Sequence, residues 1–353
     1  MQESTIVREP TVVREQASVP VPGRERDGQG GSAAPACSPF VTVRGLTKRY
    51  GEVLAVDNLD FEVREGEIFG FLGPNGAGKS TTLNIICSLL SYDRGEVTVA
   101  GCDLVRQSCE IRAIIGLVPQ EIALFENLTA RENVAFFAGL YGMKGRERKE
   151  AVAEALAFVG LAEHARKRVG RMSGGMKRRL NIACGIVHHP RLVILDEPTV
   201  GVDAQGREHI MNSIRTLRDR GATIIYTSHY LPEVQEICDR IAIIDHGRLI
   251  AQGTEIELLE VVTDVKSIVV RTEGMDDAAR ELLVGRLGVL PDVRRAAFDE
   301  GGSVLGIDVA LGLSDLTPLL NVLVEQGIRT EAVNSEAPNL EATFLALTGR
   351  ELR

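Results

Sequence analysis

The chain has 353 residues, of which 44% are hydrophobic, and its 40 lysine and arginine residues are outnumbered by 49 aspartate and glutamate residues. This length predicts two or three domains with substantial cores, and the net charge of −9 disfavours a general nucleic-acid binder. No apolar run reaches the ~20 residues that span a bilayer, and no secretory signal is visible. The six cysteines include no CxxC pair, so we expect reduced core thiols in a cytosolic protein rather than a disulfide or zinc framework.

Residues 1–38 are rich in Pro, Gly, Ser, Glu and Arg, with PGRERDGQGGS at 22–32 as the clearest linker. Such a segment buries too little apolar surface to offset its ordering entropy, so we expect this tail to be disordered. From residue 40 the pattern changes to short β-rich runs, FVTVRGL, VDNLDFEV and EIFGFLG. The last run leads into GPNGAGKS at 73–80, and KSTTLNIICSLL follows as a predicted helix. Strand, glycine loop and helix in this order are the context of a phosphate-binding loop.

Glycines give this loop the backbone freedom to point successive N–H groups at phosphate oxygens. Lys79 would neutralise the β- and γ-phosphates, and Ser80 would bind Mg²⁺. A flexible glycine loop that precedes a lysine by chance is the alternative, and the flanking strand and helix argue against it. The residues expected to bind the nucleotide are Gly73, Pro74, Asn75, Gly76, Ala77, Gly78, Lys79, Ser80 and Thr81.

The next segment, about 121–180, is predicted to be a mostly helical subdomain. Thr129 and Glu132 form a capping box before ENVAFFAGLYG, and KEAVAEALAFVGL has helical apolar spacing. Beyond it, RLVILDEP and ATIIYTSH are continuous apolar runs of the kind found in buried parallel strands. The core is therefore predicted to be α/β.

Two carboxylates end the first of these apolar runs. Asp196 is expected to emerge at the phosphate site and to hold Mg²⁺, directly or through water. Glu197 has no adjacent lysine or arginine to neutralise it, so we expect it to act as a general base on a water that attacks the γ-phosphorus. The alternative is a pair of acids that only caps the end of a strand.

The stretch MSGGMKRRL, residues 172–180, predicts a second anion site. The Ser173 hydroxyl, the unshielded N–H groups of Gly174 and Gly175 and the N-terminus of a helix all favour negative charge. We expect the three following cations, Lys177, Arg178 and Arg179, only to solvate the helix.

After about residue 262, β and α patterns alternate as βαββαβ, and NLEATFLALTG follows as a closing helix. This order predicts a small ferredoxin-like α+β domain. The expected organisation is a disordered tail over 1–38, a nucleotide-binding unit over 39–262 and an accessory domain over 263–353.

The motifs together resemble the nucleotide-binding subunit of an ABC (ATP-binding cassette) transporter over roughly residues 40–262. The resemblance rests on their order: GPNGAGKST, LVPQ ending at Gln120, MSGGMKRRL, LVILDEPT, the GVD that contains Asp203, and TSH ending at His229. It implies a P-loop NTPase cassette with an antiparallel β subdomain and a helical insert, and ATP and Mg²⁺ as ligands.

The same resemblance assigns roles to single residues. Tyr50 would stack on adenine, although an ordinary surface tyrosine is the alternative. Gln120 would touch both the Mg²⁺–water shell and the membrane partner, and His229 would bind the γ-phosphate and help to fix the attacking water. Asp203 would lie at the nucleotide site. Residues 173–175 of one chain would close over the γ-phosphate held by residues 73–80 of another, so that two ATP molecules lie between two cassettes.

SGGMKRRL resembles the form common in ATPases of drug, antibiotic, lipid and polysaccharide exporters, and NLEATFLALTGRELR resembles the tail of daunorubicin-resistance ATPases. This implies an ATP-hydrolysing subunit that powers efflux through a separate integral-membrane permease, at the cytoplasmic face of the membrane. Its second cassette would complete a homodimer or a heterodimer, and no nucleic-acid partner is expected. The alternative is a soluble ABC ATPase that acts on DNA or ribosomes. The short separation of Lys79 and Ser173, with no room for a long coiled coil, and the single cassette disfavour it.

Overall fold

The computed structural model describes residues 39–262, 265–272, 275–299, 304–310, 313, 315–325, 333–336 and 339–349. The chain divides after residue 36 into two units, and all the described residues belong to the second. The tail that we expect to be disordered lies outside the described residues.

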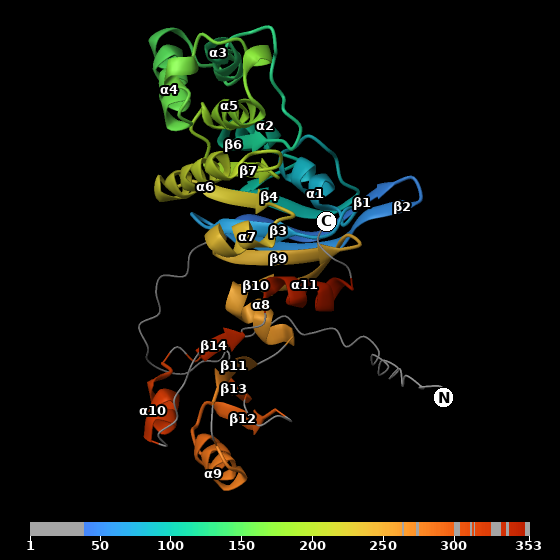
Figure 1. Ribbon diagram of the computed structural model, residues 1–353. Coiled ribbons are helices and arrows are strands. Elements are labelled where there is room, and N and C mark those ends of the chain that lie inside the picture. Colours follow the sequence, from blue (N-terminus) through green and yellow to red (C-terminus); the bar gives the residue numbers. More distant parts are fainter. Residues whose placement is uncertain are drawn as a thin grey trace, which may run out of the picture. The chain divides into compact units, whose positions relative to one another are not determined.

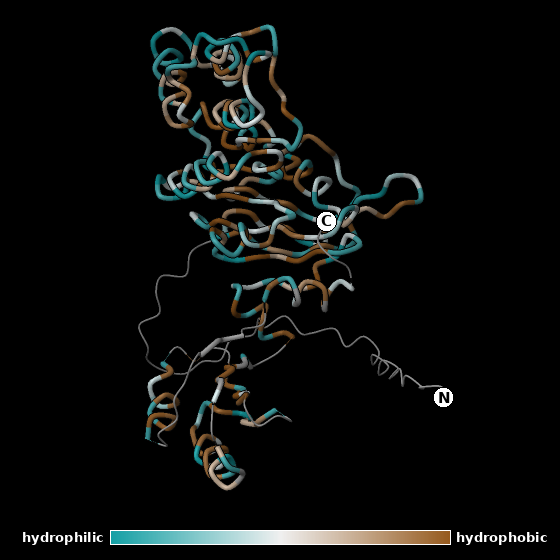
Figure 2. Tube along the Cα trace, viewed as in Figure 1, coloured by the Kyte–Doolittle hydropathy of each residue, from teal (hydrophilic) through white to brown (hydrophobic). Residues whose placement is uncertain are grey.

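A six-stranded sheet forms the centre of the cassette, with the order β10-β9-β3-β8-β7-β6. Its strands are parallel except for β10, and they carry mostly hydrophobic residues (Figure 2). Every residue of β8 and all but the last of β7 are buried, which confirms the prediction of buried parallel strands for these two apolar runs. Because the carboxyl ends of parallel strands meet at one edge, the loops after β3, β6, β7 and β8 converge there. The bounds are β3 Ile68–Leu72, β6 Ile115–Val118, β7 Leu192–Asp196, β8 Thr223–Thr227, β9 Arg240–Asp245 and β10 Arg248–Gly253.

A second, antiparallel sheet has the order β2-β1-β4-β5. Aromatic packing joins it to the central sheet. The centre of the Phe61 ring in β2 lies 5.2 Å from the ring centre of Phe71 and 5.9 Å from that of Phe69, both in β3. The antiparallel β subdomain is thereby confirmed. Its strands are β1 Pro39–Tyr50, β2 Val53–Arg64, β4 Arg94–Val99 and β5 Cys102–Asp103.

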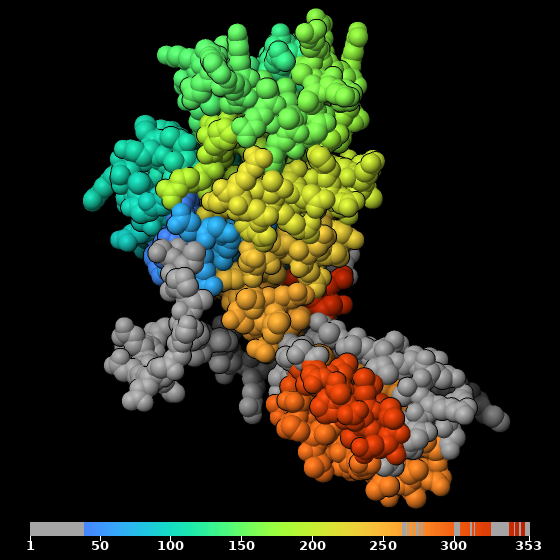
Figure 3. All heavy atoms as spheres, turned by 90° about the vertical axis from the view of Figure 1, so that its left-hand side faces the viewer, coloured from blue at the N-terminus to red at the C-terminus, as the bar shows by residue number. Residues whose placement is uncertain are grey.

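Helices α3 and α4 lie together at one end of the cassette, with α5 between them and the sheet (Figure 1). Seen from the side, α4 in green and α6 in yellow contribute to one face (Figure 3). The capping box at the start of α3 is confirmed, because Thr129 Oγ1 accepts from Glu132 N and Thr129 N donates to the Glu132 carboxylate. The helices are α1 Lys79–Ile86, α2 Ser108–Ile114, α3 Ala130–Leu140, α4 Gly145–Phe158, α5 Gly174–Ile186, α6 Ala204–Asp219, α7 Leu231–Ile237 and α8 Glu255–Val262.

The cysteines differ from one another in exposure. Cys87 and Cys184 are buried, and burial raises the pKa of the Cys87 thiol to about 12. Cys109 is exposed, so the prediction of a core thiol is wrong at this position, because this residue lies in the first turn of the short, mostly solvent-facing helix α2. Cys37 lies outside the described residues.

The C-terminal part contains a small antiparallel sheet with the order β12-β13-β11-β14. Its buried side chains form a hydrophobic cluster of their own, which includes Ile268, Ile307 and Leu323. The elements are β11 Val265–Arg271, α9 Asp277–Leu287, β12 Val293–Phe298, β13 Val304–Ala310, α10 Thr317–Glu325 and β14 Val333–Glu336.

The last helix, α11 (Leu340–Thr348), packs on the cassette rather than on this small sheet. Leu340 and Phe344 are buried in the same hydrophobic cluster as Val234 of α7 and Leu258 of α8. The sequence analysis places this helix at the end of the accessory domain, whereas its apolar side chains belong to the cassette core. None of the described helices combines the length and the hydrophobicity needed to cross a membrane.

Candidate functional site

The glycine loop after β3, residues 73–80, is the predicted phosphate-binding loop, and at two of its positions only glycine fits without a clash. A Cβ on Gly73 would lie 2.4 Å from the Ile244 carbonyl oxygen, and a Cβ on Gly78 would lie 2.5 Å from that of Ala55. Gly78 also has a φ of +100°, a conformation that other residues rarely adopt. It precedes α1 without a side-chain cap, which leaves the first turn of this helix suited to an anion.

Lys79 lies over the phosphate-binding loop, where its Nζ donates to the carbonyl oxygens of Gly73 at 2.6 Å and Pro74 at 3.1 Å. Burial lowers the pKa of this lysine, and the nearby carboxylates of Glu197 and Asp196 act in the opposite direction. The ammonium group therefore lies close to both carboxylates that the sequence analysis assigns to the site.

Thr227, at the end of β8, holds these two carboxylate residues in place. Its Oγ1 donates to Asp196 Oδ1 at 2.7 Å and accepts from the backbone N of Glu197 at 3.0 Å. Glu197 has a φ of +47°, which is strained for a residue with a side chain. The sequence analysis missed Thr227, although its position at the end of the neighbouring strand could have indicated it.

Gln120, Glu197 and His229 meet, although they follow three different strands. Glu197 Oε2 accepts from Gln120 Nε2 at 3.0 Å and lies 3.3 Å from His229 Nδ1. The Glu197 side chain is only 12% exposed, whereas the His229 side chain is 47% exposed and therefore accessible from solvent. The Glu197 carboxylate thus has two polar neighbours. Gln120 and His229 can orient this carboxylate, and they could also orient a water molecule bound to it.

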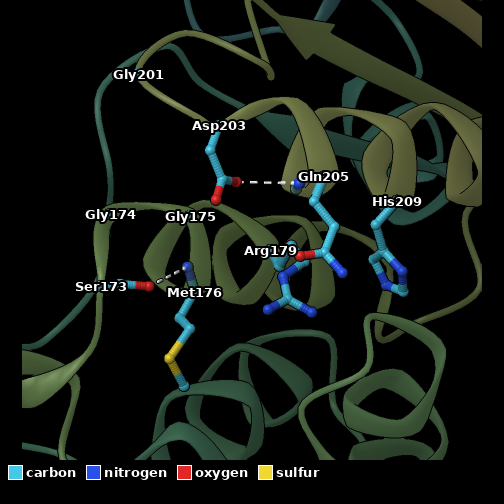
Figure 4. Close-up of a pocket in the computed structure, with 10 residues that line it drawn as sticks. Ser173, Gly174, Gly175, Met176, Arg179, Gly201, Asp203, Gln205 and His209 are labelled. Atoms are coloured by element: carbon cyan, nitrogen blue, oxygen red, sulfur yellow. Dashed lines mark hydrogen bonds between the residues drawn. The ribbon is translucent and has the colours of Figure 1, made fainter.

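At the predicted second anion site, the start of α5, the structure has an open pocket of about 450 Å³. Ser173 caps this helix by accepting from Met176 N at 3.3 Å, and Asp203 caps α6 by accepting from Gly206 N at 3.0 Å (Figure 4). The lining residues are Ser173, Gly174, Gly175, Met176, Arg179, Gly201, Asp203, Gln205, Gly206 and His209. None of them belongs to residues 73–80, so within the described part of one chain the two predicted phosphate sites are formed by separate residues.

Tyr50 is the last residue of β1 and is 49% exposed. Lys48 Nζ lies 5.6 Å from the centre of its ring. The ring remains accessible to a flat ligand, and this geometry is compatible both with adenine stacking and with an ordinary surface tyrosine.

Arg178 does not solvate the helix, and our expectation for this residue is wrong. It is buried, and its Nη1 donates to the carbonyl oxygens of Gln120 at 2.7 Å and Pro119 at 3.2 Å. Asn181, one turn further along α5, also donates to Pro119 O. The helix that starts at Ser173 therefore holds the backbone of the loop that carries Gln120. Arg179 is also partly buried, and its Nη1 donates to the Val159 carbonyl oxygen at 3.1 Å. The sequence of three consecutive cations does not indicate which of them turn away from solvent.

Comparison with known proteins identifies the family. Residues 56–200 match the model of the ABC transporter family. The chain is 42% identical over 314 residues to the linearmycin resistance ATP-binding protein LnrL of Bacillus subtilis, across 89% of this chain and 100% of that protein. The chain belongs to the ABC transporter family, among its ATP-binding ATPase subunits.

Other ABC relatives match over a similar length. The daunorubicin resistance ATP-binding protein DrrA3 of Streptomyces coeruleorubidus is 39% identical over 89% of this chain and 97% of its own. The Nod factor export ATP-binding protein I of Burkholderia orbicola is 36% identical over 89% of this chain and 98% of its own. Among solved structures, a dimeric post-hydrolysis state of the ATP-binding cassette MJ0796, bound to ADP and Pi, aligns with a TM-score of 0.56 and 30% identity over 61% of this chain and 98% of that one.

Proposed function

We propose that the chain is the ATP-hydrolysing subunit of an ABC exporter, coupled to a separate permease at the cytoplasmic face of the membrane. The observation that carries this proposal is the meeting of Gln120, Glu197 and His229 beside the phosphate-binding loop. The substrate class is drug-, antibiotic- or lipid-like, because the relatives that match most of the chain are named for linearmycin resistance, daunorubicin resistance and Nod factor export. These names do not support the alternative of an ABC ATPase that acts on DNA or ribosomes.

In this proposal residues 73–81 bind the ATP phosphates, and Tyr50 stacks on the adenine. Lys79 leaves the loop carbonyls and neutralises the β- and γ-phosphates. Glu197 polarises the attacking water and takes its proton, while Gln120 and His229 hold that water in line with the γ-phosphorus.

The chemistry of the residues fits Mg²⁺. Ser80, Asp196 and Gln120 offer hydroxyl, carboxylate and amide oxygens, the hard donors that this ion takes together with phosphate oxygens. Gln120 engages Glu197 through Nε2, which leaves its Oε1 for the ion, and Thr227 occupies only one oxygen of Asp196. The ion would neutralise charge on the phosphates.

A second copy of the chain completes each site. The chain carries both the phosphate-binding loop and the Ser173 pocket, lined by separate residues, so two copies in opposite orientation supply two full sites. Residues 173–175 and Asp203 of one copy face the nucleotide of the other. Because ADP lacks the γ-phosphate, hydrolysis removes this contact and loosens the pair.

We assign residues 39–262 to the cassette, residues 263–353 to a C-terminal accessory region and residues 1–38 to a tail. The strand order β12-β13-β11-β14, with α9 and α10 between strands, supports a ferredoxin-like domain. Helix α11 is the exception within this region, because it shares the cassette core.

A groove beside the Gln120 loop is the proposed docking site for the permease. It measures about 900 Å³, and Leu117, Pro119, Phe137 and Tyr141 contribute to its lining. Leu140 and Leu89, which both line the groove, are 67% and 62% exposed, and exposed apolar residues gathered at one groove are typical of a protein–protein contact. A helix of the permease that fills this groove would press on the backbone next to Gln120 and so connect transport with hydrolysis.

Leu140→Glu is expected to abolish co-purification with the co-expressed permease, because a carboxylate in an apolar interface must be desolvated without a partner. ATP binding should stay unchanged. The matched control is Val289→Glu, which places the same charge on an exposed valine outside the groove. Wild-type co-purification of the Leu140 variant would contradict the docking site, and a chain that ignores the permease and co-sediments with ribosomes or DNA would contradict the exporter.

A further inference from the structure

Glu233 of α7 is a buried carboxylate with an unusual number of donors. Glu233 is 2% exposed, and its Oε2 accepts from three hydroxyl groups on two segments, the end of β8 and the stretch after β7. These are Tyr226 at 2.6 Å, Thr199 at 2.8 Å and Ser228 at 3.0 Å. A carboxylate out of water needs such partners, because burial without them leaves its charge desolvated and uncompensated.

Arg207 of α6 supplies the compensating charge. Its Nε lies 3.2 Å from Glu233 Oε1, and its guanidinium carbon lies 4.9 Å from the centre of the Tyr230 ring. Tyr230 is tied to the cluster a second time, because its backbone N donates to Ser228 Oγ at 3.0 Å. We call Glu233, Thr199, Tyr226, Ser228, Arg207 and Tyr230 the Glu233 cluster.

The cluster joins the two segments that carry the proposed reacting groups. Ser228 and Tyr230 flank His229. Ser228 is held by its hydrogen bond to Glu233, and Tyr230 is held by Arg207 and by its hydrogen bond to Ser228. Thr199 follows Glu197 by two residues on the other segment, which continues through Gly201 to Asp203 and lines the Ser173 pocket. A well-packed apolar residue in place of Glu233 would fill the space without linking these segments.

We infer that Glu233 is a positioning residue that holds His229 toward Glu197 and ties this arrangement to the segment beside the Ser173 pocket. The inference rests on the proposed function, because it takes Glu197 and His229 as the groups that handle water and the γ-phosphate. When a partner copy presses on Gly201 and Asp203, the displacement reaches the His229 loop through Thr199, Glu233 and Ser228.

Glu233→Gln is the direct test, because it keeps the size of the side chain but removes its charge and one acceptor oxygen. We expect kcat for ATP hydrolysis to fall about tenfold or more, with the Kd for a fluorescent ATP analogue within about twofold of wild type. In a His229→Ala background the same substitution should cause no further loss, since both changes act on one group. A purely structural role would lower the amount of folded protein and would add to the effect of His229→Ala.

Two further variants decide the outcome if Glu233→Gln does not fold. Ser228→Ala removes the hydroxyl on the His229 side, and Thr199→Val removes the hydroxyl on the Glu197 side. The control is Ser213→Ala, which removes a hydroxyl of α6 that donates to the His209 carbonyl and has no link to Glu233. We expect both test variants, but not the control, to lower kcat with unchanged ATP affinity.

The results separate this inference from the proposed function. If His229→Ala and Glu197→Gln leave turnover intact, the proposed roles of those residues are wrong. If those two variants lower turnover but folded Glu233→Gln or Ser228→Ala keeps wild-type kcat, only the positioning role of Glu233 is overturned. The same holds if the losses from Glu233→Gln and His229→Ala multiply in the double variant.

Discussion

Glu197→Gln is expected to lower ATP turnover by about 10²- to 10³-fold, because a glutamine amide cannot take the proton of the attacking water. ATP binding should persist, since the substitution leaves residues 73–80 untouched and Gln is nearly the same size as Glu. The γ-phosphate then remains in place, so dimers should accumulate in the presence of ATP. Phosphate release measures the first effect, and size-exclusion chromatography with light scattering measures the second.

The matched control is Glu208→Gln, which removes the same charge from an exposed position on α6. It should leave turnover and dimerisation at wild-type levels. Unchanged phosphate release by the Glu197 variant would remove this residue from the role of general base, whatever the state of the dimer.

Ser173→Glu is expected to prevent ATP-dependent dimerisation and to reduce ATP turnover by about 10²-fold. The substitution removes the helix cap, and the new carboxylate repels the γ-phosphate of the nucleotide bound by the partner copy. A single chain should still bind ATP, because none of the residues that line the Ser173 pocket belongs to the phosphate-binding loop. Sedimentation velocity with and without ATP, beside a titration with a fluorescent ATP analogue, distinguishes the two effects.

Ser173→Ala distinguishes the effect of the added charge from the effect of losing the helix cap. It removes the hydrogen bond to Met176 N, at a cost of about 1 kcal/mol to the helix, but introduces no repulsion. We expect this variant to form dimers more weakly than wild type and more strongly than Ser173→Glu. Dimerisation of the Glu variant at the wild-type ATP concentration would contradict the second anion site.

The sequence predicted those parts of the fold and site that local patterns specify. Apolar runs that end in polar residues gave β7 and β8 and placed Asp196, Glu197 and His229 at one edge of the sheet. Glycines before Lys79 gave the loop, and the Thr129 capping box gave the start of α3. In each case a single segment contains the whole signal.

The sequence did not predict contacts between distant segments. Thr227, Arg178 and Glu233 are ordinary residues in their own segments, and their roles arise from partners on other strands and helices. The packing of α11 was missed for the same reason. Its apolar side indicates that the helix packs on a hydrophobic core, but it does not indicate whether that core belongs to the cassette or to the C-terminal sheet. Tertiary packing alone decides such cases.

The most direct test of the account is the dependence of ATP turnover on protein concentration. If each hydrolytic site needs residues 73–80 of one copy and Ser173 of another, specific activity must fall on dilution below the dissociation constant of the dimer and vanish for the monomer. We predict this fall, in step with the fraction of dimer measured in the same samples by light scattering. Constant specific activity in samples that contain only monomer would contradict the account.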